Sequence, residues 1–167
     1  RYLIIGGTGS LGQRLIARLI ATARVHVYSR DEAKHWTIRN DYAGHQHAGD
    51  LSFHVGDIRD SKRLADVIRR IEPTIIIVAA ALKQVDTAEY NPFEFVKTNV
   101  LGSQNVIDAS IDEGVKKVVA LSTDKASSPI NLYGATKLTA DKLFIAGNNY
   151  AHAQDTRLAV VRYGNVM

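Results

Sequence analysis

The chain has 167 residues, of which 46% are hydrophobic and 23% charged, a size and composition typical of one soluble globular domain. No apolar run approaches the roughly 20 residues of a membrane span, there is no signal-peptide pattern, and the lack of cysteine excludes disulfides and thiolate metal sites. The net charge of +4 suits either an anionic ligand or a solvated surface, and its dispersed basic residues argue against nucleic-acid binding. We therefore expect a cytoplasmic protein that has neither nucleic acid nor membrane as a partner.

Strand-like and helical patterns alternate along the whole chain. The predicted strands are residues 2–6, 24–29, 51–56, 74–80, 116–121 and 157–163, and the predicted helices are 10–22, 31–40, 60–71, 91–113 and 131–150. Most strand runs are continuous Val, Ile and Leu stretches, as in strands buried on both faces. The pattern predicts an α/β fold, a Rossmann-like doubly wound parallel sheet with helices on both faces. Because strand patterns lie at both ends, we expect residues 1–167 to be one domain of a longer protein.

A glycine-rich turn directly follows the first predicted strand and opens the first predicted helix. Dinucleotide-binding folds need one glycine for the tight turn, one for close approach of the pyrophosphate, and one for helix–strand packing. The diphosphate then lies at the positive end of the helix dipole. The residues predicted to bind a dinucleotide here are Gly6, Thr8, Gly9, Ser10, Leu11 and Gly12.

The end of the second strand distinguishes NADP from NAD. NAD enzymes place an acidic residue there to bind the ribose 2′-hydroxyl. Here Ser29 and Arg30 stand at the strand tip and Lys34 follows one helical turn later, a set that suits a 2′-phosphate. We expect Asp31 and Glu32 in the first turn of the next helix, where the dipole favours them. The predicted cofactor is NADP.

Two further segments are predicted to contact the cofactor. Asp57 and Ile58 follow the third strand, and the carboxylate could accept a hydrogen bond from the adenine amino group or, alternatively, cap the next helix. Ala79 and Ala80 follow the fourth strand, where small side chains would let the cofactor lie close to the backbone.

A set of residues suited to proton transfer follows the fifth predicted strand. Tyr133 and Lys137 are four residues apart and so project from one helix face. A nearby ammonium group favours the phenolate, so we expect Lys137 to lower the pKa of Tyr133. The hydroxyl of Thr123, at the end of the fifth strand, could hold the substrate oxygen that is oxidised.

These residues resemble the extended short-chain dehydrogenase/reductase family. Within it the chain is similar to the inverting UDP-N-acetylglucosamine 4,6-dehydratases of polysaccharide biosynthesis, and the similarity runs over essentially its whole length. The most specific stretches are residues 28–32, 79–83, 88–92, 97–99, 121–126, 129–137 and 162–166.

The resemblance implies a lyase that acts on a UDP-sugar through oxidation at C4, loss of water across C5 and C6, and hydride return to C6 with inversion at C5. It makes Tyr133, with Lys137 and Thr123, the proton acceptor for the 4-hydroxyl. It makes Asp124 the acid that protonates the departing 6-hydroxyl, and Lys125 the base at C5. An exposed ion pair in a turn is the alternative for Asp124 and Lys125.

The resemblance also assigns binding residues. Lys83 and Asn99 would line the nicotinamide and sugar end, and Asn165 and Val166 would begin the substrate-diphosphate contacts. The family continues with a C-terminal substrate-binding lobe that this chain lacks. The helix at 91–113 would form an interface in a homo-oligomer of the full-length protein.

The sequence departs from the family pattern at Val78 and Gln84, where a histidine is common, which affects substrate fine-tuning rather than the reaction. No metal site is predicted, since His45 and His47 in a polar loop have no Asp or Cys ligands nearby. Trp36 is predicted to pack against the domain.

Two other functions stay open. A UDP-hexosamine 4-epimerase of the same superfamily would share Thr123, Tyr133 and Lys137 but would not need Asp124 and Lys125 as an acid–base pair. A non-catalytic dinucleotide-binding domain would keep the glycines and would need none of these five residues.

Overall fold

The computed structural model describes residues 1–151 and 155–164 of the chain. All strands join one parallel six-stranded sheet in the order β3-β2-β1-β4-β5-β6. The order reverses between β1 and β4, and in open α/β sheets ligands bind at this switch point. The strands are β1 (Tyr2–Ile5), β2 (Val25–Ser29), β3 (Leu51–Val55), β4 (Ile75–Val78), β5 (Lys117–Thr123) and β6 (Arg157–Tyr163). The six predicted strands are confirmed.

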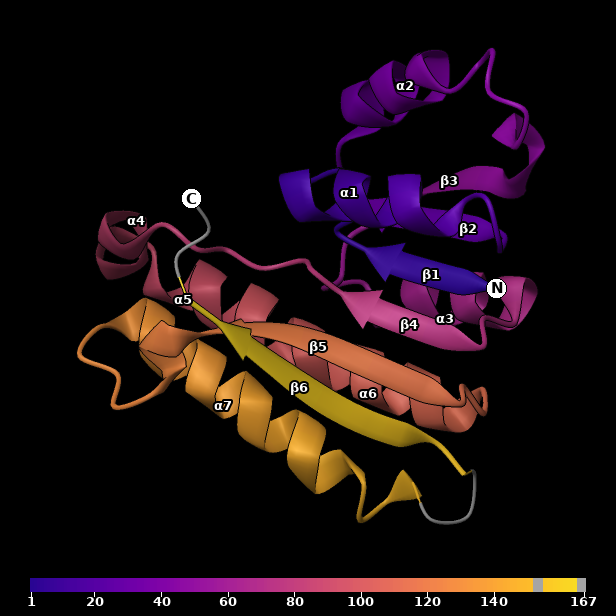
Figure 1. The fold of residues 1–167 in the computed structure, drawn as a ribbon. Coiled ribbons are helices and arrows are strands. Elements are labelled where there is room, and N and C mark those ends of the chain that lie inside the picture. The colour runs from indigo at the N-terminus through magenta and orange to yellow at the C-terminus, as the bar shows by residue number, and fades with distance from the viewer. Residues whose placement is uncertain (152–154, 165–167) are drawn as a thin grey trace.

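The helices lie on both faces of the sheet, α1 and α2 on one and α3, α6 and α7 on the other (Figure 1). They are α1 (Ser10–Leu19), α2 (Glu32–Asp41), α3 (Ser61–Ile71), α4 (Val85–Tyr90), α5 (Pro92–Phe95), α6 (Gly102–Asp112) and α7 (Leu132–Gly147). Short turns are the 3-10 helices η1 (Ala48–Asp50) and η3 (Asp124–Ala126) and the π-helical η2 (Val96–Leu101). The doubly wound Rossmann-like fold is therefore confirmed.

Two apolar clusters hold these layers together. On one face, Ile16 of α1 and Ile20, the residue that follows this helix, pack with Ile4 and Val27 of the sheet. On the other face the cluster joins α3, α6 and α7 to the central strands. Since β1 and β2 supply residues to both clusters, their continuous apolar sequence follows from burial on both sides.

The crossover between β4 and β5 differs from the single helix predicted at 91–113. Asn91 leaves helical geometry (φ −131°, ψ 53°) and separates α4 from α5, which begins at Pro92. The π-helical η2 then interrupts the path into α6. Proline suits the first turn of a helix because it has no N–H to leave unpaired, so the chain restarts a helix there.

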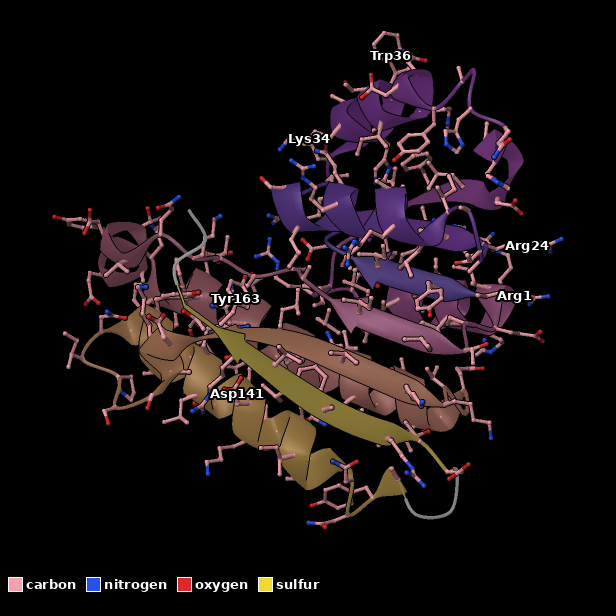
Figure 2. The ribbon with its side chains drawn as sticks, in the orientation of Figure 1. Arg1, Arg24, Lys34, Trp36, Asp141 and Tyr163 are labelled. Atoms are coloured by element: carbon pink, nitrogen blue, oxygen red, sulfur yellow. The ribbon has the colours of Figure 1, made fainter. Side chains whose placement is uncertain are left out.

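Trp36 is 63% exposed and points away from the domain at the outer side of α2 (Figure 2), so the prediction that it packs against the domain is wrong. Its helix presents Ile38 to the core instead. Within residues 1–151 and 155–164, no helix has both the length and the apolar character needed to cross a membrane.

A half-buried histidine pair on β2 and β3 predicts how stability depends on pH. His26 Nδ1 and His54 Nε2 are 3.3 Å apart, and burial, followed by the charge of His26, lowers the pKa of His54 from 6.5 to about 4. Between these two pKa values the unfolded chain binds more protons than the folded chain, so the free energy of unfolding falls as the pH drops through this range. Because the ring is only partly buried, we expect a loss of about 1–2 kcal/mol, measured by urea unfolding.

His54→Gln is expected to remove most of this pH dependence. His45→Gln, in the exposed loop after α2, is the matched control and should leave it unchanged. An equal acid sensitivity in the His54→Gln protein and the parent would contradict the assignment.

Candidate active site

A cavity of about 1100 Å³ opens at the carboxyl ends of the strands. It is lined by the glycine turn, the segments that follow β2, β3 and β4, and one face of α7. The predicted residues that line it are Gly6, Thr8, Gly9, Ser10, Leu11, Gly12, Ser29, Arg30, Lys34, Asp57, Ile58, Ala79, Ala80, Lys83, Tyr133 and Lys137. Segments far apart in sequence thus form one site large enough for a dinucleotide.

The glycine turn has the geometry that a bound pyrophosphate needs. Gly6 has φ +82°, and a Cβ there would lie 2.5 Å from the backbone nitrogen of Ala80. A Cβ on Gly12 would overlap the carbonyl oxygen of Gly7. Gly9 is the N-cap of α1, where no side chain caps the helix and the first turn carries no acidic residue. The first N–H groups of α1 are therefore not capped by a side chain and suit an anion.

Cationic and hydroxyl groups surround the tip of β2. Thr8 Oγ1 donates to Ser29 Oγ at 3.3 Å, and Arg30 lies 3.6 Å from the carboxylate of Asp57. Asp31 caps α2 by accepting from the Lys34 backbone, and its other oxygen is 2.9 Å from Lys34 Nζ. The expectation that Asp31 belongs to the start of the helix is confirmed.

The Asp57 carboxylate is hydrogen-bonded to Arg59 and does not cap a helix. Its carboxylate accepts from the Arg59 backbone at 2.9 Å and from Arg59 Nε at 3.1 Å. Burial raises the pKa of Asp57, but the Arg59 hydrogen bonds and the charges of Arg59 and Arg30 outweigh it, and the net direction is downward. The N-cap of α3 is Asp60, so the helix-cap alternative for Asp57 is wrong.

Tyr133 and Lys137 lie side by side on α7 at the inner end of the cavity. Tyr133 shares a hydrogen bond with Thr123, and Lys137 Nζ donates to the Leu121 carbonyl at 2.7 Å. Burial raises the pKa of Tyr133 and lowers that of Lys137. The expected lowering of the Tyr133 pKa by Lys137 is wrong, because the ammonium is directed to a backbone carbonyl and burial of the phenol dominates.

Asp124 and Lys125 follow Thr123 in η3, next to the cavity but not among its lining residues. Thr123 Oγ1 donates to Asp124 Oδ1 at 2.9 Å, and Lys125 Nζ lies 3.4 Å from the same oxygen. The Asp124 and Lys125 side chains are 53% and 39% exposed, and they form the turn ion pair that was the alternative. The Thr123 hydrogen bond is the main cause that lowers the pKa of Asp124. Gly134 lets α7 lie close to η3, since a Cβ there would overlap the Lys125 carbonyl.

Asn99 does not line the cavity. It is buried in η2, where its Oδ1 accepts from the Leu82 backbone at 2.9 Å. Its Nδ2 donates to the Leu82 carbonyl at 2.9 Å and to Thr136 Oγ1 at 3.1 Å. Asn99 therefore ties the segment after β4 to α7 and so positions Lys83. Asn165 and Val166, predicted to contact substrate, lie outside the described residues.

Sequence reasoning missed several lining residues: Arg14, Tyr28, Thr98, Leu121, Ser122, Val161 and Tyr163. Arg14, two residues after Gly12, could have been found as a cation on the first turns of the helix that follows the glycines. Tyr163 could have been found as the carboxyl end of the last strand, and Figure 2 shows it at the same end of the sheet as Lys34, away from Arg1.

Comparison with known proteins gives the family. The family described as polysaccharide biosynthesis protein matches residues 2–167. The chain belongs to this family. This polysaccharide biosynthesis domain therefore has the family relationship that its motifs indicated.

Its curated relatives carry different names. The domain is 48% identical to a UDP-N-acetylglucosamine 4,6-dehydratase (inverting) of Campylobacter jejuni, over 99% of the chain and 48% of the relative. It is 40% identical to a UDP-glucose 4-epimerase of Rickettsia akari and to an uncharacterized membrane protein of Methanocaldococcus jannaschii, with the same coverage. The chain thus spans about half the length of the curated relatives it matches.

Solved structures share the fold. Pen from Bacillus thuringiensis matches with a TM-score of 0.94 and 38% identity, over 99% of this chain and 52% of that one. DesIV, a dTDP-glucose 4,6-dehydratase from Streptomyces venezuelae with NAD bound, matches with a TM-score of 0.79 and 28% identity, over 97% of this chain and 55% of that one.

Among the residues described here, no group of three or more His, Cys, Asp or Glu side chains could hold a metal ion.

Proposed function

We propose that this domain is the NADP-binding half of a nucleotide-sugar 4,6-dehydratase, a hydro-lyase that acts on UDP-N-acetylglucosamine. The observation that carries the proposal is that Tyr133 and Lys137 line the cavity, with Thr123, Asp124 and Lys125 directly beside them. The name of the Campylobacter jejuni relative supports the substrate. The rest of the polypeptide would supply the substrate-binding lobe, which Asn165 and Val166 would adjoin.

We propose NADP as the cofactor because Ser29, Arg30 and Lys34 line the cavity beside the end of β2, where the ribose 2′ position would lie. When bound, NADP supplies a hydride acceptor for C4 of the sugar and returns the hydride to C6. The glycine turn would hold the pyrophosphate, Asp57 the adenine, and Lys83 the nicotinamide and sugar end.

Tyr133 would accept the proton of the sugar 4-hydroxyl at its phenolic oxygen. The Thr123 hydroxyl, already hydrogen-bonded to Tyr133, would hold the same sugar oxygen. Lys137, buried and directed to the Leu121 carbonyl, would favour the phenolate once its ammonium group turns toward the ring. Asn99 would act indirectly, by fixing the segment that carries Lys83.

Asp124 would protonate the departing 6-hydroxyl and Lys125 would remove the proton from C5, which the 4-ketone acidifies. The Thr123 hydroxyl that lowers the pKa of Asp124 is the group the sugar oxygen would recruit. Losing that hydrogen bond would raise the pKa of Asp124 and favour its acid form. Lys125 would remove the C5 proton, and after the hydride returns to C6 a proton delivered to the opposite face of C5 would leave C5 inverted, in line with the name of the Campylobacter jejuni relative.

We further propose a cytoplasmic homo-oligomer with the UDP-sugar as its small-molecule partner, and with neither nucleic acid nor membrane. Exposed apolar side chains of α5 and η2, Phe93 and Leu101, would supply part of the subunit interface. Because one relative is named a membrane protein, cell fractionation of the full-length protein tests the location, and recovery in the membrane fraction would contradict it.

The deciding experiment incubates the full-length protein with UDP-N-acetylglucosamine in deuterated water and follows the sugar protons by NMR. A 4-keto-6-deoxy product with a new C6 methyl group supports the dehydratase. A 4-epimer without dehydration supports the epimerase, the candidate favoured by the Rickettsia akari relative. Binding without any turnover supports a non-catalytic dinucleotide-binding domain.

Removing the proposed base distinguishes these functions further. Lys125→Ala is expected to slow sugar turnover about 10²- to 10⁴-fold, the usual range for general acid–base groups, while NADP affinity stays unchanged. Lys142→Ala, exposed on α7, is the matched control and should keep the parent rate. A Lys125→Ala enzyme at the parent rate would exclude Lys125 as the base.

Removing a proposed 2′-phosphate partner tests the cofactor. Arg30→Ala is expected to weaken NADP binding about 10- to 100-fold, since a hydrogen bond to a charged group contributes about 1.5–3 kcal/mol, and to leave NAD binding nearly unchanged. Isothermal titration with both dinucleotides measures this. Arg18→Ala, exposed on α1 outside the cavity, is the control. Equal losses for NADP and NAD would contradict a role at the 2′ position.

A further inference from the structure

His35 lies directly behind the predicted 2′-phosphate site. The ring is 3% exposed, belongs to α2, and does not line the cavity. Its Nε2 lies 2.8 Å from Ser29 Oγ, which does line the cavity and also accepts from Thr8 Oγ1. Its Nδ1 is buried and has no hydrogen-bond partner among the described residues. Nothing in the proposed mechanism uses this ring.

The hydrogen bonds of Ser29 are limited by its one proton and two lone pairs. Thr8 occupies one lone pair. If His35 carries its proton on Nε2, the ring donates to the second lone pair, and the Ser29 proton is left to point into the cavity. If His35 carries its proton on Nδ1, Ser29 donates to Nε2 and keeps only a lone pair for the cavity. The histidine tautomer therefore decides whether the site offers a donor or an acceptor.

The surroundings of Nδ1 favour one tautomer. Burial, and next the charge of Arg39, lower the pKa of His35, opposed by Asp31 and Glu32, so the ring is neutral near pH 7. A neutral ring with its proton on Nδ1 would leave a buried N–H without a partner, which proteins tolerate less well than an unpaired acceptor. The proton then belongs on Nε2, and the Phe53 ring, 5.2 Å away between centroids, packs against the imidazole.

We propose that His35 is a positioning residue for dinucleotide specificity, which as the Nε2–H tautomer turns the Ser29 hydroxyl into a donor for a 2′-phosphate. A phosphate oxygen can only accept, so it gains from this donor. The ribose 2′-hydroxyl of NAD can still bind by accepting, but its own proton finds no free lone pair on Ser29. The inference rests on NADP as the proposed cofactor and adds a determinant that lies outside the cavity lining.

The test measures the dissociation constants of NADP and NAD in parallel. His35→Leu removes the donor, and we expect the preference for NADP over NAD to fall about tenfold. His35→Gln keeps an N–H near the position of Nε2 and should retain the parent preference within about twofold. In a Ser29→Ala background, His35→Leu should change the ratio no further, because the effect acts through that hydroxyl. If His35→Leu still lowered the preference for NADP over NAD in the Ser29→Ala background, the proposal would be overturned.

Long-range ¹H–¹⁵N NMR of the unsubstituted protein assigns the tautomer without any variant. The Nε2–H form in the NADP complex supports the proposal, and the Nδ1–H form overturns it. Preference of the parent protein for NAD would refute NADP as the cofactor and this inference with it. A parent preference for NADP that survives His35→Leu would overturn this inference alone and leave the proposed cofactor standing.

Discussion

Tyr133→Phe is expected to reduce the turnover of UDP-N-acetylglucosamine by the full-length enzyme about 10²- to 10⁴-fold, while NADP binding stays within about twofold of the parent. The substitution removes only the phenolic oxygen, which shares a hydrogen bond with Thr123. Without this oxygen the sugar 4-hydroxyl would lose its proposed proton acceptor. Steady-state kinetics and dinucleotide titration on the same preparation measure the two effects.

The matched control for this prediction is Tyr150→Phe. Tyr150 is 77% exposed after the end of α7 and does not line the cavity. The control should keep the parent rate and affinity. A Tyr133→Phe enzyme that turned over at the parent rate would exclude Tyr133 as the proton carrier, and with it the proposed C4 oxidation.

Gly9→Ala is expected to weaken dinucleotide binding about 10- to 100-fold, without loss of folding stability, because the second glycine lets the pyrophosphate approach the backbone. Gly9 has an extended backbone (φ −74°, ψ 168°) that any residue adopts. In the structure its added Cβ would meet only the Gly6 carbonyl oxygen, at 3.6 Å, which is ordinary contact. The added methyl group would therefore obstruct the ligand and not the fold.

Gly12→Ala gives the opposite expectation. Its Cβ would overlap the Gly7 backbone, so α1 would have to move from the sheet, and we expect a loss of about 1–3 kcal/mol in unfolding free energy. Gly44→Ala, where nothing lies within 4 Å of the added Cβ, is the control for both variants. Urea unfolding and NADP titration separate the effects. A Gly9→Ala protein that binds NADP like the parent would contradict a pyrophosphate site at this turn.

Local patterns predicted the fold well because each depends on neighbouring residues. The apolar run Tyr2–Ile5 becomes β1, and Asp31 lies at the start of α2, as expected. The crossover was harder, since nothing local in Val96–Leu101 distinguishes a π-helical turn from an α-helix. The π-helical turn contains Asn99, whose side chain is hydrogen-bonded to the backbone of Leu82 in the segment after β4.

The residues of the candidate site could be predicted from the sequence about as well as the fold. Spacing alone placed Tyr133 and Lys137 on one face of α7, and both line the cavity. The direction of the Tyr133 pKa was wrong because it depends on burial by distant elements and on the carbonyl that Lys137 selects. The prediction for Trp36 was likewise wrong, since whether an aromatic ring is covered depends on which distant segments pack against it.

By itself, the sequence determined that this protein folds as a doubly wound sheet with a dinucleotide turn at Gly6, Gly9 and Gly12. The continuous apolar runs of the strands, the residue spacing along the helices and the positions of the glycines are patterns among neighbouring residues, so they are visible in the sequence. Only the tertiary structure decided that Asp124 pairs with Lys125, that Asn99 positions the segment after β4, and that His35 is hydrogen-bonded to Ser29. These roles depend on hydrogen-bond partners and desolvation, which exist only once distant segments have packed together.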